Sequence, residues 1–160
     1  MQVWATGGGV LQSIHYKWGI PMRFLIGALV VAAMAGCSSD AINISQTTAA
    51  PTDEVYAFQS RPKGPSGQVT VMRDGGVYGA GCDVVVYVDG KRAAKLGTGE
   101  RVTFYLPAGS VSLGVGLTET GLCTGAVVRT IAQSVSAGGE KRYRISSDIN
   151  GWVIEAYAEH

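Results

Sequence analysis

The chain has 160 residues, a size typical of one domain, and its 13 basic and 12 acidic side chains give a formal net charge of +1. This near balance lacks the excess of basic residues with which nucleic-acid-binding proteins neutralise phosphates, so no nucleic-acid partner is expected. Glycine is abundant, at 23 residues, and Val, Thr, Ser and Tyr are frequent after residue 66, which favours short strands joined by turns.

A signal-peptide pattern occupies residues 22–36, which read MRFLIGALVVAAMAG. A basic residue, an apolar run of about a dozen residues and a small-residue site follow one another, as in secretory signals. The apolar run is short for a bilayer core, which takes roughly 20 helical residues, so a cleaved signal helix is favoured over a retained transmembrane span. Residues 1–21 do not fit this pattern and end in Pro21 before a second methionine, so we expect them to be an over-extended gene start.

Cys37 follows this segment directly and resembles the lipidated cysteine of bacterial lipoproteins. The three residues before it are Met-Ala-Gly, with Met34 where the family usually has leucine. The resemblance implies a diacylglycerol thioether on Cys37, an acylated amino group and stable anchoring by several acyl chains. It also implies localisation at the outer membrane, facing the periplasm, because Ser38 and Ser39 follow the cysteine and no aspartate does.

Residues 37–67 are expected to form a flexible tether that begins at the lipidated cysteine. The segment is rich in Ser, Thr and Ala, shows no lasting periodicity and contains Pro51, Pro62 and Pro65. A mobile chain of this length spans about 30 Å root-mean-square, enough to lift a domain off the lipid surface. Residues 54–59 are the exception, because their apolar side chains suit either an edge strand or packing on the domain.

Residues 68–160 are predicted to form the folded domain, an all-β antiparallel sandwich or small barrel of seven to eight strands. Alternating apolar residues and turn signals at intervals of about ten residues identify the strands. The expected strands cover residues 68–73, 83–88, 91–96, 100–106, 110–117, 126–135, 141–146 and 152–157. In the second of these, valines occur at both odd and even positions, so both of its faces are expected to be covered.

The run from Val84 to Gly116 resembles PEGA-type domains of bacterial surface lipoproteins. The shared pattern is a strand, a DGK hairpin at Asp89, a glycine turn at Gly97, a second strand and a P-x-G turn at Pro107. The hairpin signal has a physical basis, because Asp and Gly both tolerate positive φ. The resemblance implies a binding, spacer or envelope-associated module without an enzymatic role.

With Cys37 lipidated, Cys82 and Cys123 remain as an even pair in an oxidising compartment, and we predict that they form a disulfide. The alternative is two buried free thiols. Neither a metal site nor a cofactor is expected, since two cysteines without histidines at ligand spacing do not make a metal site.

Histidine, the commonest general base, is scarce in this chain. His15 lies in the segment before the signal peptide and His160 is the last residue. A Ser-His-Asp or Cys-His arrangement is therefore not expected, which leaves carboxylates as the remaining candidates for catalysis. Four acidic residues are expected in solvated turns or at strand edges: Asp74, Asp89, Asp148 and Glu100.

Basic and aromatic residues in the second half of the chain suggest a recognition patch for a protein or a glycan. The competing interpretation, which we prefer, places Trp152 and Tyr157 in the core or at its end and the basic residues on outward strand faces. The residues concerned are Arg129, Lys141, Arg142, Arg144, Tyr105, Tyr143, Trp152 and Tyr157.

The leading functional hypothesis is a non-enzymatic, membrane-anchored lipoprotein of the bacterial envelope. Its β domain would act as a binding or structural module, with an envelope protein or peptidoglycan as partner. Two alternatives stay open: a periplasmic inhibitor of an enzyme such as lysozyme, and a carboxylate-based hydrolase.

Overall fold

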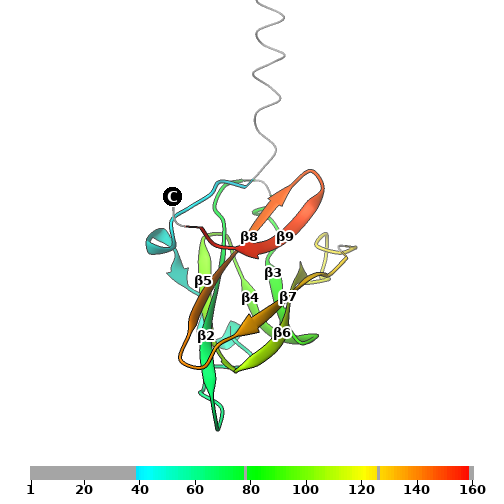
Figure 1. Cartoon of the computed structure of the whole chain (residues 1–160). Coiled ribbons are helices and arrows are strands. Elements are labelled where there is room, and N and C mark those ends of the chain that lie inside the picture. Colours follow the sequence, from blue (N-terminus) through cyan, green and yellow to red (C-terminus); the bar gives the residue numbers. More distant parts are fainter. Residues whose placement is uncertain (1–38, 78, 126, 159–160) are drawn as a thin grey trace, which may run out of the picture. The chain divides into compact units, whose positions relative to one another are not determined.

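The computed structural model describes residues 39–77, 79–125 and 127–158, which form a sandwich of two β-sheets (Figure 1). One sheet has five strands in the order β1-β5-β2-β8-β9, and the other has four in the order β4-β3-β6-β7. The predicted all-β sandwich is confirmed, and the sheets do not close into a barrel. Within these ranges, no helix is long and apolar enough to cross a bilayer.

The strands agree with the eight predicted ones to within a few residues at each end. They are β2 (Ser66–Arg73), β3 (Val84–Val88), β4 (Lys91–Leu96), β5 (Glu100–Pro107), β6 (Gly109–Leu117), β7 (Arg129–Val135), β8 (Glu140–Asp148) and β9 (Gly151–Ala156). A ninth strand of two residues, β1 (Thr48–Ala49), and two 3-10 helices, η1 (Ile44–Gln46) and η2 (Thr52–Glu54), precede them.

The core lies between the sheets and follows the alternation of the sequence. In β5, Val102, Phe104 and Leu106 are buried, while Thr103 and Tyr105 between them are half-buried. Burial of apolar side chains in this alternating pattern is the main force that holds the two sheets together.

The outer face of β3 is covered as well, as its valines predicted. Val85 is fully buried although it points away from the main core cluster. Tyr87 lies against Gly114 and Gly116 of β6, where an added Cβ would stand 3.4 Å from Tyr87 atoms, and Val128 packs on the same two glycines. Glycine at these positions leaves room for a ring to lie flat on the sheet.

The sheets are largely antiparallel, but β2 pairs in parallel with β8, with Val71 opposite Tyr143. The chain leaves β7 in one sheet and enters β8 in the other. β8 therefore starts at the same end of the sandwich as β2 and runs beside it in the same direction. This crossing between sheets is not visible in strand periodicity, which is the same for both directions of pairing.

Residues 39–65, which we name the strap, begin beside the ends of β2 and β8 and continue along the open side of the sandwich between β5 and β4. Thr48 and Ala49 pair in parallel with the start of β5, and Ala50 is buried in the core. Val55 and Phe58 also pack against the core. The predicted flexible tether is therefore wrong for this segment, and the folded unit begins at or before Ser39, upstream of the predicted boundary at residue 68.

The strap is ordered because it satisfies backbone groups that two edge strands would leave unpaired. A β-bulge shifts the pairing of β3 with β4 so that Ala93 has no partner in β3. Its carbonyl oxygen accepts the N–H groups of Tyr56 at 2.8 Å and Ala57 at 3.2 Å. The possible edge strand at residues 54–59 is thus realised as packing on the domain, with a single β-bridge from Val55 to Ala94.

The loops gather at the two opposite ends of the sandwich. The disulfide end carries the loops at 74–83, 97–99, 118–128 and 149–150. The basic end carries the last part of the strap and the turns at 89–90, 108 and 136–139. In Figure 1 the β8–β9 turn of the disulfide end is at the top and the chain leading into β2 is at the bottom.

Candidate functional site

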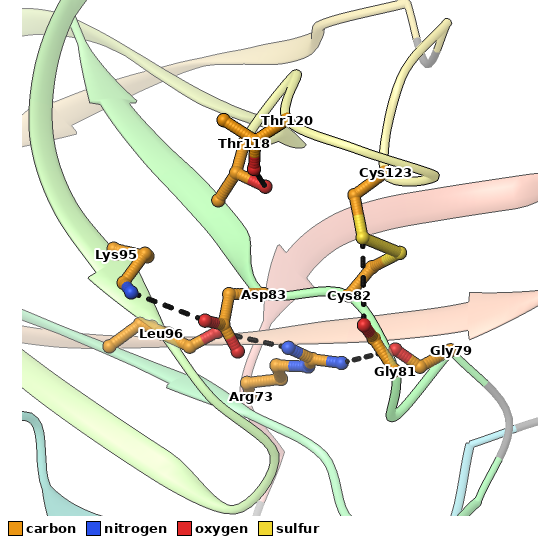
Figure 2. Close-up of a disulfide and its surroundings, with 10 residues drawn as sticks. All are labelled: Arg73, Gly79, Gly81, Cys82, Asp83, Lys95, Leu96, Thr118, Thr120 and Cys123. Atoms are coloured by element: carbon orange, nitrogen blue, oxygen red, sulfur yellow. Dashed lines mark hydrogen bonds and ion pairs between the residues drawn. A yellow bond between two sulfur atoms is a disulfide. The ribbon is translucent and has the colours of Figure 1, made fainter.

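The disulfide between Cys82 and Cys123 joins two long loops at the disulfide end (Figure 2). The sulfur atoms are 2.11 Å apart, and the Cα–Cα distance of 5.4 Å is within the usual range for this bond. The structure thus contains the predicted pair. The two residues are 41 positions apart, so the bond closes a loop that contains all of β3 to β6.

Arg73, the last residue of β2, is buried beneath the loop that leads to the disulfide. Its Nη1 donates a hydrogen bond to the carbonyl oxygen of Leu96 at 2.9 Å, and its Nη2 donates to that of Gly79 at 2.8 Å (Figure 2). The guanidinium also lies 4.7 Å from the ring centre of Trp152. One side chain therefore fixes the end of β4, the loop after β2 and the start of β9 relative to one another.

Burial lowers the pKa of Arg73, and the nearby carboxylates of Asp83 and Glu100 act in the opposite direction. A guanidinium stays protonated across the physiological range and offers only donors. Arg73 is therefore suited to hold backbone carbonyls in place, and not to transfer protons.

Asp74 is buried next to Arg73, so the predicted solvated turn is wrong for this residue. Its side chain is 1% exposed, and Oδ2 accepts hydrogen bonds from Nη2 of Arg144 and from Oγ of Ser39, the latter at 3.4 Å. Burial raises the pKa of Asp74 by more than the hydrogen bond and charge of Arg144 lower it. This ion pair connects the start of the strap, the end of β2 and the middle of β8.

The other three acidic residues occupy the turn and edge positions predicted for them. Oδ1 of Asp89 accepts the N–H of Ser112 at 2.8 Å, and Oδ1 of Asp148 accepts the N–H of Asn150 at 2.7 Å. Oε2 of Glu100 accepts the N–H of Gly97 at 2.8 Å. Asp148 and Glu100 therefore have partners within their own turns, whereas the partner of Asp89 lies in the neighbouring strand β6.

A series of cation–aromatic contacts forms where the strap reaches the basic end. The Arg61 guanidinium lies 5.1 Å from the ring centre of Tyr105, Lys91 Nζ lies 5.6 Å from that of Phe58, and the Arg92 guanidinium lies 5.9 Å from that of Tyr56. In each pair one partner comes from the strap. We name this group the cationic–aromatic surface: Tyr56, Phe58, Arg61, Lys91, Arg92 and Tyr105.

The polar ends of this surface are available to a partner. Arg61, Lys91 and Arg92 are exposed, and Tyr56 is 47% exposed. Exposed cations beside aromatic rings suit a ligand that combines carboxylates with flat apolar faces.

The aromatic residues of the alternative recognition patch do not come together. Tyr143 is in the core, where burial raises the pKa of its hydroxyl, and Trp152 lies on Arg73. The hydroxyl of Tyr157 accepts a strap N–H at 3.3 Å. Only Tyr105 belongs to the cationic–aromatic surface.

The basic residues of that patch are also separated from one another. Arg129 donates to the carbonyl oxygen of Asn150 at 2.7 Å, Arg142 pairs with Glu140 at 3.0 Å, and Lys141 is exposed. The interpretation of outward strand positions is correct for these residues. Arg144 also alternates with the core residues Tyr143 and Ile145, but its side chain is only 20% exposed and is paired with Asp74.

Two shallow hollows border the strap. One, of about 200 Å³, lies between the strap and β8 and is lined by Ala41, Ile42, Asn43, Arg144, Tyr157 and Ala158. The other, of about 380 Å³, follows β1 and β5 and is lined by Ala49, Ala50, Val55, Gln59, Arg101, Val102 and Thr103. No carboxylate is among the residues lining either hollow.

The residues that define the site were not predicted from the sequence, because their partners are distant in sequence. The Lys-Arg pair after Asp89-Gly90 and the aromatic residues at 56 and 58 were visible signals, but nothing local indicated that they meet. Cys37, Ser38, His15 and His160 lie outside the described residues.

Comparisons with protein-family models, curated proteins and solved structures found no match to this chain. The site is therefore interpreted from its own chemistry.

Proposed function

We propose that this protein is a lipid-anchored lipoprotein of the bacterial envelope, held at the periplasmic face of the outer membrane through Cys37. Its β-sandwich acts as a non-enzymatic binding module, with the cationic–aromatic surface as its recognition site. The partner we favour is peptidoglycan, which offers carboxylates to the cations and sugar rings to the aromatic side chains.

The observation that carries this proposal is the course of the strap. It begins at the disulfide end, where the N–H of Ser39 donates to the carbonyl oxygen of Ser147 at 2.8 Å, and it ends in the cationic–aromatic surface. Ser39, two residues after the cysteine proposed to be lipidated, is thus at the opposite end of the sandwich from the candidate recognition site. That polarity suits a module anchored at one end and binding at the other.

The alternative functions have less support. Asp89, the acidic residue in the turn at the basic end, has its carboxylate engaged by Ser112, so it does not form the free acidic tip that an inhibitor of lysozyme would use. A hydrolase would use converging carboxylates in a concave site, and the hollows beside the strap are lined by none.

The lipid anchor is tested by mass spectrometry of the mature protein purified from membranes. We expect an N-terminal peptide that begins at Cys37 and carries a diacylglycerol thioether and an amide-linked acyl chain. The Cys37→Ser variant is expected to lose membrane association. A wild-type protein that keeps residues 22–36 and carries no lipid would contradict the proposal.

Recognition is tested by co-sedimentation of the protein with purified peptidoglycan sacculi. Lys91→Glu is expected to weaken binding at least about tenfold, because it reverses a charge in the cationic–aromatic surface. Lys141→Glu makes the same change in net charge at an exposed position outside that surface and serves as the matched control. If both variants lost binding to the sacculi equally, or if the wild type did not bind them, peptidoglycan would be rejected as the partner.

A further inference from the structure

Apolar side chains are concentrated in the loops of the disulfide end. Six large hydrophobic residues are exposed in the described part of the chain, and five of them lie in three loops at this end. Their exposed fractions are 93% for Val77, 100% for Leu122, 82% for Val127, 41% for Val128 and 79% for Ile149. Scattered exposed apolar residues are ordinary, but a group at loop tips on one end indicates a contact surface.

The three loops are tied to one another, so their apolar tips form one constrained group. The Cys82–Cys123 disulfide connects the first loop with the second. Arg129, at the end of the second loop, donates to the carbonyl oxygen of Asn150 in the third. Gly79 of the first loop packs so closely on Trp152 that an added Cβ would stand 2.7 Å from the ring.

The chain enters the sandwich at this same end. Ser39 is bound to Ser147 next to the third loop, and Asp40 forms a β-bridge with Gly75 at the start of the first. Two residues of extended chain span at most roughly 7 Å, so acyl chains on Cys37 would be attached close to Ser39, where the described chain begins. No tether of tens of ångströms separates the predicted acyl chains from the loop tips.

We propose that the disulfide end is seated on the lipid bilayer, with the tips of Val77, Leu122, Val127 and Ile149 in the headgroup and upper acyl region. This inference rests on the proposed function, because the acyl chains on Cys37 bring the end to the membrane. The tips then fix the orientation of the domain and direct the cationic–aromatic surface away from the lipid. Exposed Asp40 and Glu119 are at this end as well, which favours zwitterionic over anionic lipid.

Tryptophan quenching by lipid tests this orientation. Trp152 is the only tryptophan after residue 36, and it gives the background signal. Leu122→Trp places a second indole at a tip of the disulfide end, and Ala137→Trp places one in an exposed turn of the basic end. Each full-length lipidated variant is reconstituted into phosphatidylcholine–phosphatidylethanolamine vesicles, with and without lipids brominated on the acyl chain.

We expect brominated lipid to reduce the added fluorescence of Leu122→Trp at least about twofold and to leave that of Ala137→Trp unchanged. Quenching at neither position would overturn the seating, and quenching at Ala137→Trp alone would reverse the orientation. The fluorescence of the Leu122→Trp variant could also be unquenched in pure lipid and yet shift its emission in native envelope membranes. That result would show that the tips contact a protein, and it would overturn the lipid assignment.

The experiment distinguishes an incorrect lipid-anchor hypothesis from an incorrect orientation of the disulfide end. Mass spectrometry of each reconstituted sample establishes whether Cys37 carries lipid. A lipidated sample without quenching at position 122 rejects the seating and leaves the proposed function intact. A protein without lipid on Cys37 rejects both.

Discussion

The two ends of the sandwich differ in how their loops obtain a defined conformation. At the basic end the turns are short, and local chemistry defines them: Asp89 and Gly90 have φ values of 48° and 75°, as a two-residue hairpin requires. At the disulfide end the loops are long and are held by contacts between distant residues, chiefly the Cys82–Cys123 bond and buried Arg73. A turn specified locally needs no support, whereas a long loop needs a covalent or buried polar connection to offset its conformational entropy.

The largest expected effect follows from removing the covalent connection. The double variant Cys82→Ser/Cys123→Ser is expected to lose roughly 4 kcal/mol of unfolding free energy, because the bond closes a long loop in the unfolded chain. Urea unfolding measures the loss, and reduced wild-type protein should match the variant. Hydrogen exchange should show faster exchange at residues 118–128 and little change at the β3–β4 turn. Uniform acceleration at both ends would contradict the contrast between them.

Removal of the buried cation tests the polar connection at the same end. Arg73→Ala is expected to cost about 3 kcal/mol in urea unfolding, since it leaves the carbonyl groups of Leu96 and Gly79 without their donor and opens a cavity beneath Trp152. The exposed Arg92→Ala variant at the basic end is the control and should change stability by no more than about 0.5 kcal/mol. Equal effects of the two substitutions would show that Arg73 is not a structural clamp.

Phe58 allows a test of how the strap is held near the basic end. Its ring packs edge-on against Phe104 at 6.2 Å, while its backbone has a φ of 62°, which is strained for a bulky residue. Phe58→Ala is expected to cost about 2 kcal/mol of unfolding free energy. Phe58→Gly should cost about 1 kcal/mol less than Phe58→Ala, because glycine adopts positive φ without strain.

Tyr56, two residues earlier, supplies the control for this pair of substitutions. It is not among the residues with positive φ, so Tyr56→Gly should be more destabilising than Tyr56→Ala. Urea unfolding measures the stability of all four variants. If the alanine variant were more stable than the glycine variant at both positions, the backbone at Phe58 would not be strained.

The smallest effect concerns the pH dependence of the buried pair at the disulfide end. Since the pKa of Asp74 is raised in the folded state, the folded protein retains a proton that the unfolded chain has lost, over the interval from about pH 3.9 to the raised value. Unfolding free energy therefore falls as pH rises through this interval, by up to about 1.4 kcal/mol per pH unit, and is level above it. Asp74→Asn should remove this slope, which urea unfolding of both proteins at several pH values measures. The prediction would be contradicted if the wild type became more stable relative to the variant as the pH rises.

Most of the sandwich could be predicted from the sequence because its strands and turns are local features. The alternation of Val102, Phe104 and Leu106 specifies which face of β5 enters the core, and Asp89-Gly90 specifies the hairpin before β4. The cysteine pairing was predictable for a different reason, since removal of Cys37 from the count leaves one possible pair.

The candidate site was less accessible to the same reasoning. Tyr56 and Phe58 stood out as too apolar for a linker, but their place beside Arg92 and Lys91 depends on the bulge at Ala93, which frees a carbonyl to bind the strap. Gly75 and Gly76, which follow Asp74, predicted a solvated turn at this residue. Its burial depends on Arg144, which is 70 positions away.

By itself, the sequence determined the class of fold, the positions of eight strands, the tight turns and the disulfide pair, because periodicity, turn chemistry and cysteine count act within short stretches of chain. The tertiary structure alone decided that the strap is folded, that β2 and β8 run in parallel, and that Arg73 and Asp74 are buried. These features depend on which edge strands and carbonyl groups remain unpaired once the sheets have packed. That information arises only when residues distant in sequence are brought together.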